Sequence, residues 1–453
     1  CDRTTKENKE NQISYVLTKA TDNNVKFIRL WFTDIFGSVK GFGITIDELE
    51  KVLNEGASFD GASIFGSERF QESEMIAMPD PTTFEILPWR PEENSVAKIT
   101  CEIINKDGTP SALDSRFILK KKLNELKEKG LNFYVAPEIE YFYLEDSENM
   151  KPIDEKTYFD QVGIHSDLGS DLRRKTVIGL EKIGIPIQKF HHEVSPGQQE
   201  ISLRYNDSLT IADNIQTFKL LVKEVANSEN VFATFMPKPF EEYEGNGMHL
   251  HISLFEGEKN LFAHEKKSKS GVSKQGENFT AGLLKHVNEF MLATNQWVNS
   301  YKRIASMNEA PSYRCWSKNT DYGNLITIPE IRKIGDISSR IEFRLPDPAC
   351  NPYLSFAAII TAGLEGMQNN YKLEPAMEES FSTLSPEDLN EFEDTKKLAQ
   401  DLGTSIKNAE KGSILKNALG EEAYSVFLKG KKREWAEYLK TVSNFELKNF
   451  LNL

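Results

Sequence analysis

The stretch EGNGMHLHISLF (residues 244–255) alternates polar and apolar side chains behind two glycines. Every second side chain of an extended chain points to the same face, so His249, His251 and Ser253 share one face. The opposite face is apolar and consists of Met248, Leu250, Ile252 and Leu254. The pattern predicts a strand that is buried on one side. A histidine on its polar face is either a hydrogen-bonded structural residue or a ligand, and this stretch alone leaves both open.

Paired glutamates occupy two further strand-like stretches. In APEIEYFYL, Glu138 and Glu140 flank one isoleucine, so both carboxylates leave the same face of a strand. FHHEVSPGQQEISLRY adds Glu193 and Glu200 around a Pro-Gly turn. Like charges this close raise one another's pKa unless a cation lies between them. The Glu138–Glu140 pair taken alone is also compatible with a solvated sheet face.

Arginines and a glutamate alternate in SSRIEFRLPDP, where Arg340, Glu342 and Arg344 share one strand face. This row is compatible with a structural set of ion pairs. Considered with the other glutamates and the histidines, it indicates oxygen ligands with an occasional imidazole, which suit Mg²⁺ or Mn²⁺. Arginines beside such ions suit phosphate groups. GxxxxGK[ST] does not occur in the sequence, so we predict metal-assisted phosphoryl transfer without a Walker loop.

Composition excludes several classes of protein. The 55 basic and 69 acidic residues give a net charge of −14, and no dense Lys/Arg stripe occurs, which argues against a nucleic-acid partner. The 4 cysteines show no CxxC spacing, which argues against a zinc ribbon or disulfide framework and favours a reducing, cytoplasmic location. The polar start of the chain predicts no signal peptide, and the lack of long apolar runs predicts no membrane span.

The pattern of elements predicts a small and a large domain. VKFIRLWFTD (25–34) and VAKITCEII (96–104) read as strands, and TIDELEKVLNEG (45–56) reads as a helix. Turn formers concentrate in residues 105–114, so we expect domains at 13–108 and 109–453 after a polar tail at 1–12. In the large domain, we expect a helix at 115–130, a strand at 131–144, and mostly helix from 385 onward.

Several stretches in one order resemble glutamine synthetase of the type I class, alpha subgroup, from about residue 13 to the C-terminus. They are FTDIFGSVKG, FDGASIFG, EIEYFYL, HHEVSPGQQEI, ATFMPKP, GNGMHLHISL, NSYKR, NEAP, RIEFRLPDPACNPYLSFAA and KREWAEYLKTVSNFEL. The resemblance implies an α+β fold with a small β-grasp N-terminal domain. A large catalytic domain with a curved antiparallel sheet and helices follows it.

The resemblance also implies a reaction and an assembly. ATP phosphorylates the γ-carboxylate of glutamate, and ammonium supplies the amine that displaces the phosphate. Two to three Mg²⁺ or Mn²⁺ ions serve each site. The chain would form a homododecamer of two hexameric rings with active sites shared between subunits, and a PII-type protein is a possible regulator.

Carried over by position, the resemblance gives each candidate residue a role. The first metal would be held by Glu140, Glu193 and Glu200, and the second by Glu138, His249 and Glu342. His251 and Ser253 would contact ATP, and Arg340 would face its transferring phosphate. Glutamate would be held by Arg303, Arg344 and Gly245, beside Glu244 and beneath a flap that carries Glu309. Asp60 and Ser63 of a neighbouring subunit would form the ammonium pocket with Tyr158 and Glu193.

The chain departs from the family pattern in two places. Glu244 stands where the family usually has Asn, and SKNTDYGNLITIP (317–329) lacks the arginines usual there. Asp321 and Thr327 fall near the positions of those arginines, and Lys318 is a partial substitute. Since arginine forks bind phosphate and carboxylate, we predict weakened binding of nucleotide or glutamate.

These departures keep two other interpretations open. One is a γ-glutamyl-amine ligase that uses another amine or acid. The other is a catalytically impaired paralogue that acts as a regulator or sensor. Two positions concern regulation: Ser382 replaces the tyrosine that is adenylylated in the beta subgroup, and Arg69 matches an arginine linked to feedback inhibition in the alpha subgroup.

Overall fold

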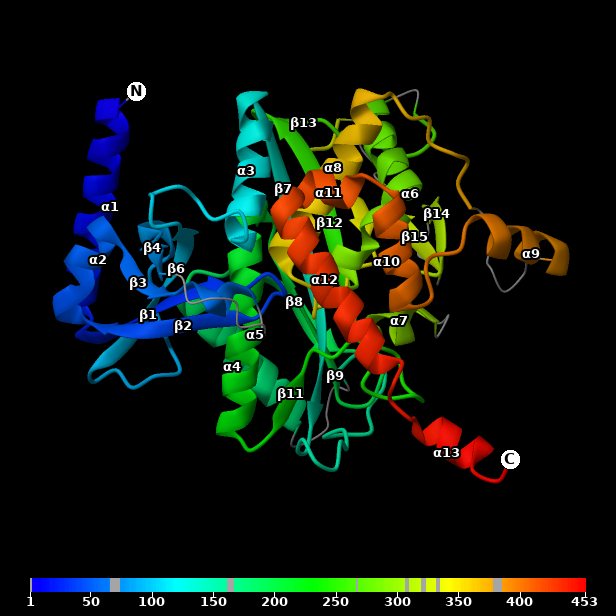
Figure 1. Ribbon diagram of the computed structural model, residues 1–453, viewed down its shortest axis with the longest axis horizontal. Coiled ribbons are helices and arrows are strands. Elements are labelled where there is room, and N and C mark those ends of the chain that lie inside the picture. Colours follow the sequence, from blue (N-terminus) through cyan, green and yellow to red (C-terminus); the bar gives the residue numbers. More distant parts are fainter. Residues whose placement is uncertain are drawn as a thin grey trace.

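The structure, a computed structural model, describes residues 2–65, 74–160, 167–265, 268–305, 309–318, 323–330, 335–377 and 385–453. Arg69, Asp321 and Ser382 lie outside the described residues. The chain forms a smaller N-terminal part, on the left of Figure 1, and a larger part built on a second sheet. Among the described residues, no helix combines the length and the apolar character needed to cross a membrane.

Six strands form the first sheet, in the order β2-β1-β6-β4-β3, with β5 paired to β6. They are β1 (Val25–Thr33), β2 (Val39–Thr45), β3 (Ala57–Asp60), β4 (Glu74–Pro79), β5 (Glu85–Ile86) and β6 (Ser95–Ile104). The parallel pair β1 and β6 lies inside the sheet, and helix α2 (Leu49–Glu55) contacts β4. This confirms the predicted β-grasp fold and its two predicted strands. Helix α1 (Asp2–Asp22) includes most of the expected polar tail.

Ten strands form the second sheet, with the main order β14-β15-β16-β12-β7-β9-β8. They are β7 (Leu131–Leu144), β8 (Ile187–His192), β9 (Gln198–Leu203), β10 (Asn206–Asp207), β11 (Phe232–Thr234), β12 (Met248–Glu256), β13 (Lys259–Asn260), β14 (Tyr313–Ser317), β15 (Asn324–Thr327) and β16 (Ile341–Phe343). The strands pair antiparallel as predicted, except that β14 and β15 are parallel. The predicted strand at 131–144 is β7.

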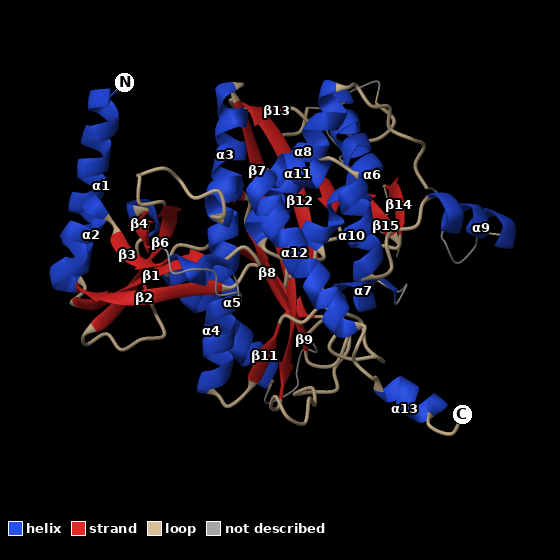
Figure 2. Ribbon diagram, in the orientation of Figure 1, coloured by secondary structure: helices blue, strands red, loops and turns tan. Residues whose placement is uncertain are grey.

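Helices follow the first sheet in the chain, and Figure 2 shows most of them packed around the second sheet, while the helices at 386–395 and 444–450 extend away from it. They are α3 (Ser115–Glu128), α4 (Leu168–Lys182), α5 (Ser208–Ser228), α6 (Lys274–Thr294), α7 (Val298–Ala305), α8 (Pro352–Gln368), α9 (Pro386–Thr395), α10 (Leu402–Lys411), α11 (Ile414–Leu419), α12 (Glu421–Tyr438) and α13 (Asn444–Phe450). Three short 3₁₀ turns lie in the N-terminal part: η1 (Ile46–Glu48), η2 (Gly61–Phe65) and η3 (Pro81–Thr83). The helices predicted at 115–130 and from 385 onward are confirmed.

Polar contacts fix the first sheet to the second part of the molecule. Arg116 at the start of α3 is buried and forms ion pairs with Asp80, Glu102 and Asp213, two from the N-terminal part and one from α5. Asn351 donates to the backbone oxygen of Asp34, in the turn after β1. Because a buried guanidinium is stable only with such partners, these contacts hold the two parts in one arrangement.

Candidate active site

The register of the second sheet brings the predicted polar side chains to one face. On β12, Met248, Leu250, Ile252 and Leu254 are buried, while His249 and its alternating neighbours face the other side. The predicted alternation is therefore confirmed. Residues directly opposite one another on neighbouring strands are Glu138–His249, Glu140–Glu200, His191–Glu200 and His251–Glu342. Five strands thus contribute to one patch of acids and imidazoles.

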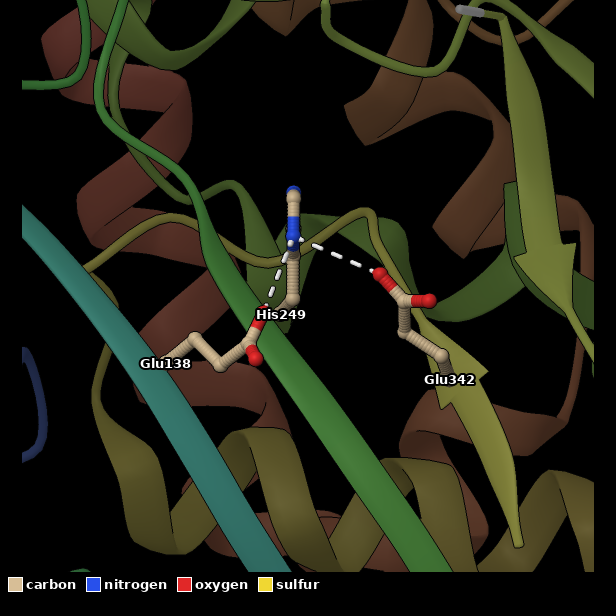
Figure 3. Close-up of side chains that lie close together, drawn as sticks. All are labelled: Glu138, His249 and Glu342. Carbon is tan, nitrogen blue, oxygen red and sulfur yellow. Dashed lines mark ion pairs between the residues drawn. The ribbon is translucent and has the colours of Figure 1, made fainter. Parts of the chain in front are cut away.

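Glu138, His249 and Glu342 form a first cluster, which Figure 3 shows. His249 Nδ1 lies 3.7 Å from Glu138 Oε2 and 3.5 Å from Glu342 Oε1. Burial disfavours the charged form of Glu138, but hydrogen bonds from His249 and His251 outweigh it and lower the pKa of this carboxyl. Two carboxylates and one imidazole are a donor set that suits Mg²⁺ or Mn²⁺.

His191, Glu193 and Glu200 form a second cluster, with one ligand atom of each within 4.8 Å of the others. His191 Nε2 lies 3.3 Å from Glu200 Oε1, and its Nδ1 lies 3.7 Å from Glu193 Oε1. The resemblance had grouped Glu140 with these two glutamates. Glu140 Oε2 instead accepts a hydrogen bond from the Gly247 amide at 2.7 Å, directly beside the cluster.

The electrostatics of the glutamates fit a divalent cation. Burial and the charges of Glu193 and Glu200 raise the pKa of Glu140. Burial and the charge of Glu200 raise the pKa of Glu193 to about 7. Buried carboxylates that repel one another are stabilised when a cation lies between them. The residues of both clusters therefore fit Mg²⁺ or Mn²⁺ by donor type, proximity and charge.

We predict that Mn²⁺ affinity rises steeply with pH between 6 and 8. Protons on Glu140 and Glu193 must leave before these groups can bind a cation, and the Glu193 carboxyl titrates near 7. Each displaced proton changes the affinity by up to about tenfold per pH unit below that pKa. Calorimetric titrations in buffers of different ionisation enthalpy measure the affinity and the protons released. Glu193→Gln should flatten the dependence, and a flat profile for the unmodified chain would contradict the prediction.

A cavity of about 1000 Å³ adjoins the first cluster. It is lined by Glu138, Lys189, His251, Ser253 and Arg340, and on another side by aromatic rings: Tyr134, Tyr205 and Phe255. Arg340 Nε donates to His251 Nδ1 at 3.2 Å. The structure thus brings together the three residues predicted to contact ATP, beside rings that can stack on a flat heterocycle.

The two arginines predicted to hold glutamate, Arg303 and Arg344, lie near Glu140 and Glu342 respectively. Arg303 is buried and donates to the Leu345 carbonyl oxygen at 2.8 Å. A Cβ at Gly245 would lie 2.4 Å from the Pro237 oxygen, so only glycine permits the backbone to pass so close to Arg303. Arg344 Nε lies 3.5 Å from Glu342 Oε1, which connects this region to the first cluster.

Glu244, the first departure from the family, contacts the segment that carries Glu309. Its Oε2 accepts a hydrogen bond from the Glu309 amide at 3.3 Å, and Arg344 donates to the Glu309 carbonyl oxygen at the same distance. Burial and the charge of Glu244 raise the pKa of Glu309. Glu244 therefore has a backbone partner within the chain.

The residues predicted for the ammonium pocket do not all meet within one chain. The Tyr158 amide donates to the Glu193 carbonyl oxygen at 3.1 Å, which fixes Tyr158 beside the second cluster in a strained left-handed conformation with φ 53°. Asp60 and Ser63 lie at the end of β3 and in η2, in the N-terminal part. Figure 1 shows β3 well apart from β9.

The described part of the second departure does not supply phosphate-side cations. Thr327 is buried on β15, directly opposite Glu342. Lys318 lines a separate cavity of about 790 Å³ with Lys274 and Trp316, and is not among the residues lining the Arg340 cavity. Lys318 is therefore not placed to substitute for a missing arginine.

The sequence interpretation missed Lys189 and His191. Both lie on β8, with Glu193 just beyond its end. The alternation of Lys189, His191 and Glu193 is the same two-residue spacing that identified the other strands. This alternation is the signal in the sequence by which Lys189 and His191 can be identified.

Comparison with known proteins agrees with this geometry. Residues 24–106 match the family model "Glutamine synthetase, beta-Grasp domain", and residues 112–450 match "Glutamine synthetase, catalytic domain". A relative named glutamine synthetase from Mycolicibacterium smegmatis is 42% identical, over 98% of this chain and 100% of its own. Another of that name from Staphylococcus aureus is 39% identical, over 95% and 96%.

Solved structures show the same fold. A protein named GmaS, solved without ligand, superposes with a TM-score of 0.82 at 27% identity and covers 96% of this chain and 99% of its own. Glutamine synthetase from Plasmodium falciparum gives a TM-score of 0.83 at 25% identity, with 98% of each chain covered. Family models, relatives and structures agree over nearly the whole length, and the chain belongs to the glutamine synthetase family.

Proposed function

We propose that the protein is an ATP-dependent ligase that forms glutamine from glutamate and ammonium through a γ-glutamyl phosphate. The observation that carries the proposal is the pair of carboxylate–imidazole clusters beside an aromatic-lined cavity, with Arg344 in contact with Glu342. The family and the relatives named glutamine synthetase support it. A structure of GmaS with ADP, which superposes with a TM-score of 0.82, supports nucleotide binding at the same fold.

The clusters and the cavity would have separate roles in phosphoryl transfer. Glu138, His249 and Glu342 would hold one ion, and Glu193 and Glu200 another, with Glu140 and His191 beside it. Such ions, when bound, neutralise phosphate oxygens and stabilise the charge that develops during transfer. Arg340 and His251, joined by their hydrogen bond, would face the transferred phosphate from the cavity side.

Glutamate would enter from the side of Arg303 and Arg344. A guanidinium fork binds a carboxylate in a fixed orientation, which places the γ-carboxylate toward the clusters. Arg344 contacts both Glu342 and the backbone of Glu309, so it can couple substrate binding to the position of that segment. The Glu309 segment would exclude water from the acyl phosphate.

Ammonium would bind at Glu193 and Tyr158, completed by Asp60 and Ser63 of a neighbouring subunit. An acidic pocket favours a cation, and a carboxylate there can accept the proton that ammonium must lose before it attacks. This arrangement requires an oligomer, and the family is typically oligomeric. We propose a dodecamer of two hexameric rings, with a PII-type protein as a possible regulator.

The test is turnover of the purified chain with glutamate, ATP and Mg²⁺ against a panel of amines. We expect glutamine as the product and a preference for ammonium over methylamine or ethylamine of at least about tenfold in kcat/KM, because an additional methyl group must fit a pocket shaped for a small cation. Phosphate release measures the rate with each amine, and mass spectrometry identifies the product. A preference for an alkylamine would mean that this amine, and not ammonium, is the substrate. The absence of ATP turnover with every amine would contradict a ligase activity.

A further inference from the structure

One ammonium group contacts both carboxylate clusters. Lys189 Nζ lies 3.3 Å from Glu138 Oε1, in the first cluster, and 3.4 Å from Glu200 Oε1, in the second. Its strand, β8, is at the end of the sheet order, and its side chain is 50% exposed. The same side chain lines the cavity that contains His251 and Arg340. Lys189 therefore lies between the two clusters proposed to bind metal ions, and it also lines the cavity proposed to bind the phosphates of ATP.

The charges around the clusters explain why an ammonium group lies there. Five carboxylates converge: Glu138, Glu140, Glu193, Glu200 and Glu342. Arg344 contacts Glu342, His249 contacts Glu138 and His191 contacts Glu200. Like charges at these separations repel strongly in a partly buried site. A cation between Glu138 and Glu200 reduces this repulsion in the metal-free protein.

The alternative to a functional role is that Lys189 forms an ordinary surface ion pair. Many lysines contact glutamates on protein surfaces and add little to stability. Two features distinguish Lys189. Its partners are themselves predicted metal ligands, and one of them, Glu200, is buried with 4% of its surface exposed. The lysine also lines the cavity of about 1000 Å³ that contains His251 and Arg340. A lysine on its flexible four-carbon stem is a point charge that can leave one partner for another.

We propose that Lys189 is a positioning residue that occupies the space between the two clusters until divalent ions displace it, and that its ammonium group then turns toward the polyphosphate in the adjoining cavity. The second half rests on the proposed function, whereas the first half concerns only metal binding. Lys189 would also provide phosphate-side charge that Lys318 cannot, since Lys318 lines a different cavity.

The two parts of the proposal, displacement of Lys189 by metal ions and its turn toward phosphate, predict opposite effects of Lys189→Met on Mn²⁺ affinity and ADP affinity. Lys189→Met keeps the length of the side chain and removes the charge, so incoming ions have no competitor. Mn²⁺ binding to the nucleotide-free protein should tighten by about five- to tenfold. ADP binding at saturating Mn²⁺ should weaken by about tenfold, because one charge-assisted contact to phosphate is lost. Lys189→Arg should weaken Mn²⁺ binding, because a guanidinium fork holds two carboxylates more firmly than an ammonium does.

Calorimetry of the full-length chain gives both affinities without turnover, and thermal unfolding verifies that each variant is folded. Lys175→Met is the matched control, because Lys175 is similarly exposed and paired with Glu229 away from the clusters. Lys189→Gln replaces the Met variant if that variant does not fold. Unchanged or weaker Mn²⁺ binding in Lys189→Met overturns the displacement. Unchanged ADP binding overturns the turn toward phosphate. If the unmodified chain binds no ADP, the proposed function fails, while the Mn²⁺ comparison still decides the first half.

Discussion

Replacing Glu342 by glutamine is expected to reduce turnover on the order of a thousandfold while the fold is retained. Glu342 Oε1 lies 3.5 Å from His249 Nδ1 and 3.5 Å from Arg344 Nε, so one carboxylate serves the first cluster and the arginine predicted to hold glutamate. Glutamine preserves size and shape and removes the charge. An ion in the first cluster would lose an anionic ligand, and Arg344 would lose an acidic partner.

The loss should be specific to the chemistry. Mn²⁺ titration of Glu342→Gln should show one class of ion weakened, with the thermal midpoint of the metal-free protein near that of the parent. Glu256→Gln is the matched control, because Glu256 is exposed at the end of β12, does not line this cavity and has no ion pair to either cluster among the described residues. That variant should remain within about threefold of the parent, as surface changes usually do. Near-normal turnover in Glu342→Gln would mean that the first cluster is not a metal site.

The polar face of this site could be read from the sequence because strand periodicity is local. His249 and Glu342 were identified from alternation in single stretches; burial follows that alternation on β12, whereas all three residues of β16 are buried. Which strands become neighbours depends on packing over long distances in the chain, which no local pattern specifies. The contact between His249 and Glu342 came from family resemblance alone, and the register of β12 against its neighbours explains it physically.

Of the features of the site, side-chain conformations were the least predictable from the sequence. Glu140 lies next to Glu193 and Glu200 along the sheet, yet its oxygen is bonded to the Gly247 amide, and His191 lies closest to the other two. The backbone conformation at Gly247 decides this, since a Cβ there would lie 2.8 Å from a nitrogen of Arg303. The conformation of Glu244 is likewise not specified by its local sequence: its carboxylate accepts a hydrogen bond from the Glu309 amide.

Two inactive variants are expected to restore activity when they share one assembly. Asp60 lies at the end of β3 in the N-terminal part, where its Oδ1 accepts from the Ala62 amide, and Glu140 lies on β7 beside the second cluster. If a site takes Asp60 from one subunit and Glu140 from the next, Asp60→Ala and Glu140→Ala each inactivate every site alone. In a mixed assembly, a site has both residues intact where a Glu140→Ala chain contributes Asp60 and an Asp60→Ala chain contributes Glu140.

The expected recovery follows from pairing statistics. With equal amounts of the two chains and random order around a closed ring, about a quarter of the sites combine an intact Asp60 with an intact Glu140. Co-expression with two different affinity tags and purification through both provides assemblies that contain both chains, and turnover per site is then measured. A recovery near a quarter of parent activity, from two chains with almost none, is a large signal.

The control for this experiment is the pair Glu140→Ala and Glu342→Ala. Both residues lie on strands of the same sheet, so every site in any mixture lacks one of them and no activity should return. Recovery in that pair would point to exchange of whole strands or to contamination by the parent. Absence of recovery in doubly purified Asp60/Glu140 assemblies would place Asp60 outside the site, and the ammonium pocket would then have to be built from Tyr158, Glu193 and their neighbours within one chain. The topology is compatible with sharing, because Glu193, which would attract ammonium, directly follows β8, the last strand in the order of the second sheet.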